Sequence, residues 1–346
     1  MNESIKLSTF KNPVFKYNFD ILAVCLTLTA VGVYLNGIYA LWQIVLCALT
    51  AVLSELIAFK LVLKKNTVGD LSALTTGMLI GLMLPVSAPF YVGICSCIFA
   101  IVVAKLPFGD VRNTPFVPAA AGMCFGAMMF TDAVFTYPEF GSDFVFFGSE
   151  GFSKGYTIFD MLSKGDSLSL NVFGRVELLS GAYPGAIGTT SMLTLLGVFS
   201  FLCLRRPKRM FACFGYFASV AFFALLFPRV NSGIISSVIS ELCAGSLIFT
   251  AMLLITDPVC SPRQPSRAFA YGALAGAVCM LLRYFSKTPD PSCFSVLIAN
   301  ALWPVLTNET VLRKKSEQPA KKKAKPEIRK ITSKVKASDK KEAQTK

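Results

Sequence analysis

Apolar stretches separated by short polar ones run along most of the chain, from residue 20 to residue 306. The hydrocarbon core of a bilayer, about 30 Å thick, takes roughly 20 apolar residues of helix, and fewer where a span is short or broken. The stretches of this kind cover residues 20–34, 38–62, 71–86, 90–104, 118–135, 190–204, 210–227, 236–256, 268–285 and 292–306. This pattern predicts an all-α polytopic membrane protein with about ten transmembrane helices. One proline motif in each half, Leu84-Pro85 and Asp257-Pro258, also suggests two five-helix repeats.

Basic residues in the connections predict the orientation of these helices. With the N-terminus in the cytoplasm, fourteen Lys and Arg residues before residue 313 fall on the cytoplasmic side and six on the outer side. Cytoplasmic loops of membrane proteins carry such an excess of positive charge. An even number of helices also brings the C-terminus to the inside, so we expect both termini in the cytoplasm.

Three regions follow from this arrangement. Residues 1–19 are a cytoplasmic N-terminal segment, residues 20–312 a transmembrane domain, and residues 313–346 a basic cytoplasmic tail. The first apolar stretch follows a polar lead without a cleavage site, so we interpret it as a signal anchor. The largest connection, residues 137–185, is an extracytoplasmic loop that is too short for a separate catalytic domain.

Composition excludes several functional classes. The 346 residues include no histidine, which rules out His-ligated haem and zinc as well as imidazole acid–base catalysis. The eleven cysteines include no Cys-x-x-Cys pair and lie mostly within apolar stretches, so we interpret them as buried apolar side chains. A cluster shared with a partner subunit is the alternative. We predict no catalytic residue and no metal site of the chain's own.

Charge is distributed unevenly along the chain. Residues 313–346 hold fourteen basic and four acidic residues, a net charge of +10, which leaves +4 of the total of +14 to the rest. Such a Lys-, Ala- and Pro-rich tail is typical of a disordered, solvated segment. Attraction to anionic lipid or to an acidic partner subunit is the alternative. Because the excess charge belongs to the tail, it does not indicate a nucleic-acid partner.

Four acidic residues lie within or near predicted helices, namely Glu55, Asp132, Glu241 and Asp257. Ionisable groups at membrane depth are costly and commonly mark ion pathways. Glu55 and Glu241 lie deepest and are the candidates for ion coupling, whereas Asp257 closes its helix on the cytoplasmic side. The alternative for each is a carboxylate paired with a neighbour, and Lys60 could pair with Glu55 on the same helix.

Two Gly- and Pro-containing segments lead into predicted helices, residues 107–118 from the cytoplasm and residues 183–191 from outside. Irregular backbone persists at membrane depth only where protein or a lined cavity satisfies its polar groups. The free N–H groups at such a helix start suit an anion or a ring carbonyl, and a simple N-capped turn is the alternative.

Four motifs occur in a fixed order along the chain. They are Gly-Asp-Leu-Ser-Ala-Leu-Thr-Thr-Gly at 69–77, Asn-Thr-Pro-Phe-Val-Pro-Ala-Ala at 113–120, Pro-Gly-Ala-Ile-Gly-Thr-Thr-Ser at 184–191 and Thr-Asp-Pro-Val-Cys-Ser-Pro at 256–262, continuing to Pro-Asp at 289–290. This ordered set resembles the family of the D subunit of the Rnf electron-transport complex and the B subunit of the sodium-translocating NADH:quinone reductase. The resemblance covers nearly the whole chain except the tail.

The resemblance implies an electron-carrying subunit of a bacterial inner-membrane complex that couples electron transfer to Na⁺ or H⁺ transport. In this family a threonine of the outer loop holds FMN through a phosphoester bond. The matching stretch here is Lys154-Gly155-Tyr156-Thr157, so the resemblance makes Thr157 the flavin-bearing residue. The flavin contacts that it implies are Gly155, Gly185, Gly188, Thr190 and Ser191, and riboflavin or a second flavin is a further cofactor.

The implied partners are cluster-containing and nucleotide-binding subunits, a second flavoprotein subunit, a flavin transferase and membrane lipid. The chain departs from the family's flavin motif at Lys154, Tyr156 and Ile158, so a flavin-free scaffold or assembly subunit is a second hypothesis. A solute permease is a third hypothesis, because ten helices with a repeat would suit one. In none of the three is the chain a complete enzyme by itself, since a ferredoxin:NAD or NADH:quinone oxidoreductase needs further subunits.

Overall fold

The computed structural model describes residues 13–58, 60, 71–108, 114–140, 154–158, 180–229, 234–286 and 288–307. Within these ranges the chain is helical without a strand, and one isolated antiparallel bridge joins Pro138 and Lys154. The chain divides into two compact units, Met1–Asn300 and Ala301–Lys346. The contacts and sites described below lie within the first unit.

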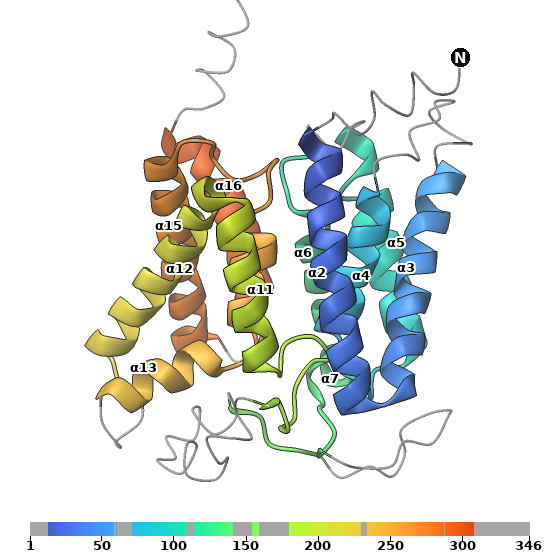
Figure 1. The fold of residues 1–346 in the computed structure, drawn as a ribbon, viewed down its shortest axis with the longest axis horizontal. Helices are drawn as coiled ribbons and strands as arrows, with labels where there is room; N and C mark the ends of the chain where they lie inside the picture. Colours follow the sequence, from blue (N-terminus) through green and yellow to red (C-terminus); the bar gives the residue numbers. More distant parts are fainter. Residues whose placement is uncertain are drawn as a thin grey trace, which may run out of the picture. The chain divides into compact units, whose positions relative to one another are not determined.

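Two groups of helices follow each other along the sequence. The first group is α2 (Pro13–Asn36), α3 (Ile38–Ala58), α4 (Ser72–Met83), α5 (Phe90–Val102), the short η3 (Leu106–Phe108), α6 (Pro118–Met129) and α7 (Thr131–Phe135). The second group is α11 (Met192–Arg205), α12 (Pro207–Leu226), α13 (Ile234–Cys243), α14 (Leu247–Phe249), η5 (Thr250–Leu254), α15 (Pro265–Phe285) and α16 (Ser292–Thr307). Figure 1 shows α2 to α6 gathered on one side, in blue to teal, and α11, α12, α13 and α15 on the other, in green to orange.

Each of the ten apolar stretches predicted from the sequence contains a helix, but the helices differ in length. Those long and apolar enough to cross a membrane are Lys16–Asn36, Ile38–Ala58, Phe90–Phe108, Pro207–Leu226 and Pro265–Phe285. A sixth span results if Ser237–Cys243 and Leu247–Leu254, which meet at a bend of 70°, count as one. The shorter apolar helices are α4, α6, α11 and α16. The described residues therefore support the predicted helical membrane class, with five or six spans by length and composition.

Helix α4 is short because both of its ends are fixed by local chemistry. Leu71 precedes it with a left-handed φ of 54°, and Pro85, which has no N–H to donate, follows Leu84 at its other end. The carbonyls of Leu82 and Leu84 instead accept hydrogen bonds from the N–H groups of Gly188 (2.8 Å) and Ile187 (3.1 Å). A turn far along the sequence thus completes the end of α4.

The predicted helix 236–256 is broken, which corrects the continuous span expected from its apolar composition. Gly245 has a φ of 67°, a left-handed conformation that favours glycine. The guanidinium of Arg283 donates to the carbonyl oxygens of Glu241 (2.8 Å) and Ala244 (2.6 Å) at the end of α13. On the other side of the break, the Asp290 carboxylate accepts from the Ser246 N–H (2.8 Å). Two oppositely charged side chains therefore satisfy the backbone groups that the break exposes.

Glycines allow the closest helix packing. A Cβ at Gly272 of α15 would lie 1.8 Å from the Ala212 carbonyl oxygen of α12, and one at Gly215 of α12 would lie 2.1 Å from the Phe269 oxygen of α15. In the first group, a Cβ at Gly77 of α4 would lie 2.6 Å from the Cys47 oxygen of α3. The cysteines that the sequence placed in apolar stretches are buried as predicted, namely Cys25, Cys47, Cys124, Cys213 and Cys279.

Candidate functional site

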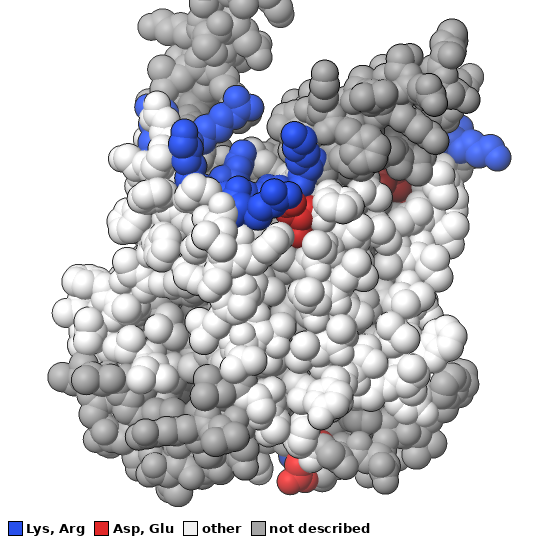
Figure 2. Space-filling view, viewed as in Figure 1, with Lys and Arg blue, Asp and Glu red and all other residues white. Residues whose placement is uncertain are grey.

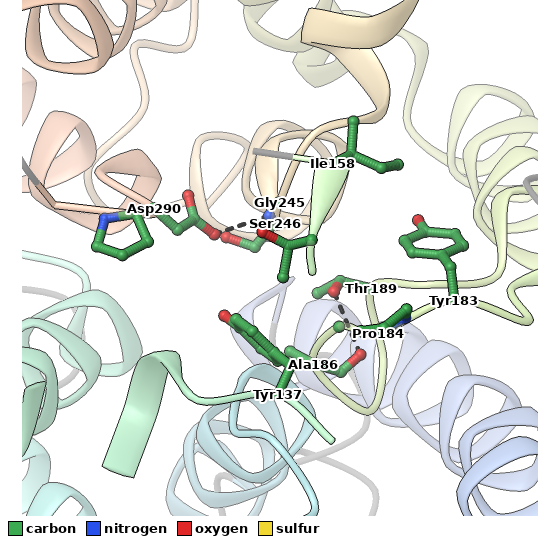
Figure 3. Close-up of a pocket in the computed structure, with 12 residues that line it drawn as sticks. Tyr137, Ile158, Tyr183, Pro184, Ala186, Thr189, Gly245, Ser246 and Asp290 are labelled. Carbon is green, nitrogen blue, oxygen red and sulfur yellow. Dashed lines mark hydrogen bonds between the residues drawn. The ribbon is translucent and has the colours of Figure 1, made fainter. Parts of the chain in front are cut away.

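A pocket brings together five segments that are separate in the sequence (Figure 3). Three of the segments lie between α7 and α11: the residues just after α7, the 154–158 segment and the turn at 183–189. The other two are the break between α13 and α14 and the connection between α15 and α16. The lining residues are Tyr137, Thr157, Ile158, Tyr183, Pro184, Gly185, Ala186, Thr189, Gly245, Ser246, Pro289 and Asp290. Together they surround a small cavity of about 20 Å³.

Thr157 reaches this pocket because the short 154–158 segment is held on both sides. The Gly155 N–H donates to the Tyr137 carbonyl (3.0 Å), next to the bridge between Pro138 and Lys154. A Cβ at Gly155 would lie only 2.4 Å from Pro184 Cγ, so this close approach requires glycine. Thr157 itself is 8% exposed and lines the pocket.

The turn at residues 183–191, predicted from the sequence to contact the flavin, has several structural roles. Gly185 lines the pocket, as does Thr189, whose hydroxyl donates to the Ala186 carbonyl (3.2 Å). Gly188 packs against α4, because its Cβ would lie 2.8 Å from Leu82 Cβ. Ser191 caps α11 by accepting from the Thr194 N–H (3.4 Å).

Five residues were expected as flavin contacts around Thr157, and the structure brings one of them to the pocket lining. Gly185 lines the pocket, whereas Gly155, Gly188, Thr190 and Ser191 do not. Thr190 is buried, and its hydroxyl oxygen has no hydrogen-bond partner among the described residues.

Asp290 and Ser246 form the facing side of the pocket, and the sequence did not single them out as site residues. Besides the Ser246 N–H, the Asp290 carboxylate accepts from the Ser292 hydroxyl (2.6 Å) and the Ser292 N–H (3.2 Å). Figure 3 shows Asp290 reaching toward Gly245 and Ser246, with Tyr137 and Thr189 opposite. The Pro-Asp pair at 289–290, quoted for the family resemblance, was the available signal for this residue.

Two tyrosines give the pocket aromatic surface. Tyr183 is buried, and this burial raises the pKa of its phenol well above the usual range. The phenol therefore stays neutral at physiological pH. Tyr137 lines the pocket from the end of the α7 connection. Neutral aromatic rings beside hydroxyl groups suit a planar, partly polar ligand.

A second cavity of about 50 Å³ lies among α2, α4, the start of α6 and the turn that follows η5. Its polar lining residues are Tyr17, Asn18, Ser72, Thr75, Thr76, Lys105, Thr114 and Asp257. The Asp257 carboxylate accepts from the N–H groups of Val259 (3.1 Å) and Cys260 (3.2 Å). Burial raises the pKa of Asp257, and the two backbone hydrogen bonds oppose that shift.

Glu55, a candidate for ion coupling, is buried beside this second cavity. Its carboxylate pairs with the Lys105 ammonium at 2.5 Å, and the same ammonium lies 2.7 Å from the Ser72 hydroxyl oxygen. Lys60, the partner that the sequence suggested, is exposed. The alternative of a paired carboxylate is thus confirmed for Glu55, but its partner Lys105 lies in the turn after α5 instead of on the same helix.

Glu241, the other candidate, is enclosed by two arginines. Its carboxylate lies 3.0 Å from Arg283 Nη1 and 3.5 Å from Arg229 Nε. The side chains of Glu241 and Arg283 are 1% and 0% exposed. Arg229 also donates to the Arg283 carbonyl and lies over the Tyr284 ring, 4.4 Å from its centroid. This cluster stands at the α13–α14 break.

Long apolar helices, a broken helix with capped ends and a polar pocket beside the break define a multi-pass helical membrane protein. A family model described as the NQR2, RnfD, RnfE family matches residues 8–315. The chain belongs to this family, which confirms the resemblance found in its motifs.

Curated relatives share the family. The chain is 26% identical over 292 residues to the D subunit of the Na(+)-translocating ferredoxin:NAD(+) oxidoreductase complex of Acetobacterium woodii, covering 84% of this chain and 87% of the relative. It is 29% identical over 297 residues to the D subunit of the ion-translocating oxidoreductase complex of Salmonella dublin, covering 77% and 84%. The corresponding D subunit of Actinobacillus pleuropneumoniae is 24% identical over 332 residues, covering 86% and 94%.

Proposed function

We propose that this chain is the D-type membrane subunit of an ion-translocating oxidoreductase complex and carries electrons through FMN bound covalently to Thr157. The observation that carries the proposal is the pocket that joins Thr157 to the turn at 183–189 and to Asp290. Three motif regions of the family, separate in the sequence, meet there around one threonine. The names of the relatives support the membership of a multi-subunit, ion-translocating complex.

The residues at the pocket fit a flavin by their chemistry. Thr157 offers the hydroxyl for a phosphoester, and Lys154, three positions earlier, is exposed and can balance the phosphate charge. Tyr137 supplies aromatic surface, while Thr189 offers a hydroxyl group to ring carbonyls or N–H groups. A bound flavin accepts two electrons and passes them on singly, which suits a subunit between different carriers.

The second cavity is the place that we propose for riboflavin or another second flavin. Its hydroxyl-rich lining includes Ser72, Thr75 and Thr76, which offer hydrogen bonds to a polar ring edge. Lys105 supplies a positive charge that would stabilise a reduced, anionic ring. Glu55 is the ion-coupling residue that we propose beside this cavity, since it shares Lys105 with it.

The proposed topology has ten spans, with α4, α6, α11 and α16 also crossing the bilayer and both termini in the cytoplasm of a bacterial inner membrane. Short or broken helices can serve as spans where other segments cover their ends, as the turn at Ile187 and Gly188 covers α4. The five helical segments before the outer loop and the five after it form the proposed repeats. Partners would be the cluster-containing, nucleotide-binding and flavoprotein subunits, with a flavin transferase for Thr157.

Mass spectrometry and in-gel fluorescence test the flavin. The full chain, co-expressed with its own flavin transferase, should yield a peptide containing Thr157 with the added mass of FMN, and a fluorescent band. Thr157→Ala should abolish the fluorescence, whereas Thr189→Val, which keeps the acceptor hydroxyl of Thr157, should retain it. A wild-type chain without flavin under these conditions contradicts the proposal.

A flavin-free scaffold subunit is the second candidate, favoured by one observation. Thr157 is 8% exposed, so a transferase would need the 154–158 segment to open before it could reach the hydroxyl. In this case the complex assembled with Thr157→Ala would transfer electrons from ferredoxin or NADH as fast as the wild-type complex.

A further inference from the structure

Basic side chains gather where α11 meets α12, at one end of the helices. Figure 2 shows them as a blue cluster with a small red area among them. The members of this basic corner are Arg205, Arg206, Lys208 and Arg209 at the junction of the two helices and Arg263 and Arg267 at the start of α15. Arg209 lies close enough to Arg206 and Arg263 for their charges to interact, which joins the two parts of the cluster.

The carboxylate beside the basic corner is turned inward. Asp20 pairs with Arg206 at 2.7 Å and with Arg205 at 3.2 Å, and its side chain is 10% exposed. Arg205 is nevertheless 60% exposed, and Lys208 and Arg263 are exposed as well. The outward face of the corner is therefore positive, because its negative partner lies beneath it.

Exposed apolar side chains begin directly next to these charges. On α11, Leu204 is 86% exposed, and further residues with exposed fractions of 39–67% are Leu193, Leu196 and Phe201. On α12, Phe211 and Phe214 are 44% and 45% exposed, with ring centroids 6.5 Å apart. Lys208 and Phe211 are about 4.5 Å apart along the helix axis, so the surface changes from cationic to apolar within one turn.

The space beside the middle of α11 is open. A Cβ at Gly197 would meet no atom within 4 Å, while Phe199 contacts Phe214 across the hairpin with centroids 5.6 Å apart. The α11–α12 hairpin thus presents an aromatic face with room next to it and positive charge at its end.

We propose that the α11–α12 hairpin binds one anionic phospholipid, with its phosphate at the basic corner and its acyl chains along the exposed face of α11 and α12. An anionic phospholipid matches this surface, because its anionic headgroup is followed within a few ångströms by hydrocarbon chains. Basic sites at helix ends on a membrane surface commonly hold anionic lipid headgroups. The tail at residues 313–346 carries a net charge of +10, the same sign as the basic corner, so its charge does not match this site.

Native mass spectrometry of the full chain tests the lipid site. The chain is titrated with phosphatidylglycerol and, separately, with phosphatidylcholine of the same acyl chains. The wild-type chain should retain phosphatidylglycerol in a 1:1 complex more strongly than phosphatidylcholine. Lys208→Gln with Arg263→Gln leaves the Asp20 pairs intact and should weaken phosphatidylglycerol binding about 25-fold, at about fivefold for each charge removed. The charge-keeping pair Lys208→Arg with Arg263→Lys should restore the binding.

Controls separate this site from a general effect of surface charge. Lys60→Gln removes an exposed basic residue after α3 and should leave the lipid preference unchanged, and a thermal melt should show that every variant is folded. Equal binding of the two lipids, or an unchanged preference in the Lys208→Gln, Arg263→Gln chain, overturns the proposal. If these substitutions instead release an acidic partner subunit while the chain shows no lipid preference, the corner is a protein interface and the proposal is wrong. No flavin enters the measurement, so its outcome is independent of the function proposed for Thr157.

Discussion

Two buried carboxylates, one in each half of the molecule, differ in how firmly their partners are held. Glu55 shares the single ammonium of Lys105 with the Ser72 hydroxyl, beside an open cavity. Glu241 faces Arg283, whose guanidinium also binds two backbone carbonyls at a helix break. An ammonium is a compact charge on a flexible stem, whereas a guanidinium makes several hydrogen bonds in a fixed plane. The Glu55–Lys105 pair can therefore change its geometry when the adjacent cavity is filled. The Glu241–Arg283 pair instead stabilises the backbone at the α13–α14 break.

This difference distinguishes two residues that the sequence ranked equally as candidates for ion coupling. Membrane depth alone made Glu55 and Glu241 comparable candidates for ion coupling. The contacts give Glu241 a structural task at the α13–α14 break and leave Glu55 next to the cavity proposed for a second flavin. Four predictions, described below, can break or sharpen this comparison.

Arg283→Met should have the largest effect on stability. The substitution leaves the Glu241 carboxylate and the carbonyl oxygens of Glu241 and Ala244 without their main partner, so the free energy of unfolding should fall by about 3–5 kcal/mol. Unfolding in mixed micelles with increasing SDS measures it. Arg263→Met, at an exposed position, is the matched control and should stay within about 0.5 kcal/mol of wild type. A small loss for Arg283→Met would show that the break does not depend on its capping.

The Glu55–Lys105 pair should respond differently from the arginine cluster. Lys105→Met and Glu55→Gln should each cost about 3 kcal/mol, because each leaves its partner unpaired in a buried place. The double variant should recover part of this loss, with a coupling energy of about 1–3 kcal/mol from the double-mutant cycle. Strictly additive losses would mean that the two side chains do not stabilise each other.

Helix packing should also differ between the halves. Gly272→Ala places a Cβ 1.8 Å from a backbone oxygen and should cost about 1–3 kcal/mol by overpacking, more than Gly77→Ala, where the distance is 2.6 Å. Gly197→Ala meets nothing within 4 Å and should stabilise α11 by up to about 1 kcal/mol. One thermal-melt series measures all three, and an order reversed between Gly272 and Gly77 would contradict the packing described here.

Asp290→Asn should have the smallest effect on stability and a clear one on the pocket. Its carboxylate accepts hydrogen bonds from Ser246 and Ser292, and an amide group in its place keeps one acceptor oxygen. We expect a loss of about 1–2 kcal/mol in the free energy of unfolding. The flavin fluorescence at Thr157 should decrease, because the pocket wall at Gly245 and Ser246 loses its anchor. If the variant is destabilised by this amount but keeps normal fluorescence, Asp290 is not needed for flavin binding at Thr157.

The positions of the helices could be predicted from the sequence, but their breaks could not. All ten apolar stretches contain helices, because apolar length and composition are local properties of the chain. The helix expected at residues 118–135 divides into α6 and α7 at Phe130, and the helix expected at 236–256 breaks at Gly245. A glycine in an apolar stretch does not reveal whether it forms a break or a packing contact, as Gly245 and Gly272 show.

Only part of the candidate site could be predicted from the sequence. Thr157 and Gly185 follow from the family resemblance, and both line the pocket. Tyr137 and Ser246 reach the same pocket from segments outside the four motifs. Asp290 belongs to the Pro-Asp pair that continues the last motif, but that motif alone does not place it beside Thr157. Gly188 and Ser191 belong to the right turn, yet their tasks are to pack on α4 and to cap α11.

The sequence alone determined the helical membrane class and the family, since these depend on residue types and their order. The role of Thr157 as the flavin-bearing residue stays a prediction. The tertiary structure decided which charges pair, because the partners are distant along the chain: 50 residues separate Glu55 from Lys105, and 42 separate Glu241 from Arg283. A buried carboxylate must find a counter-ion wherever the packing of helices brings one. That requirement predicts a pair for each carboxylate but does not name the partner, and only the arrangement of the helices supplied it.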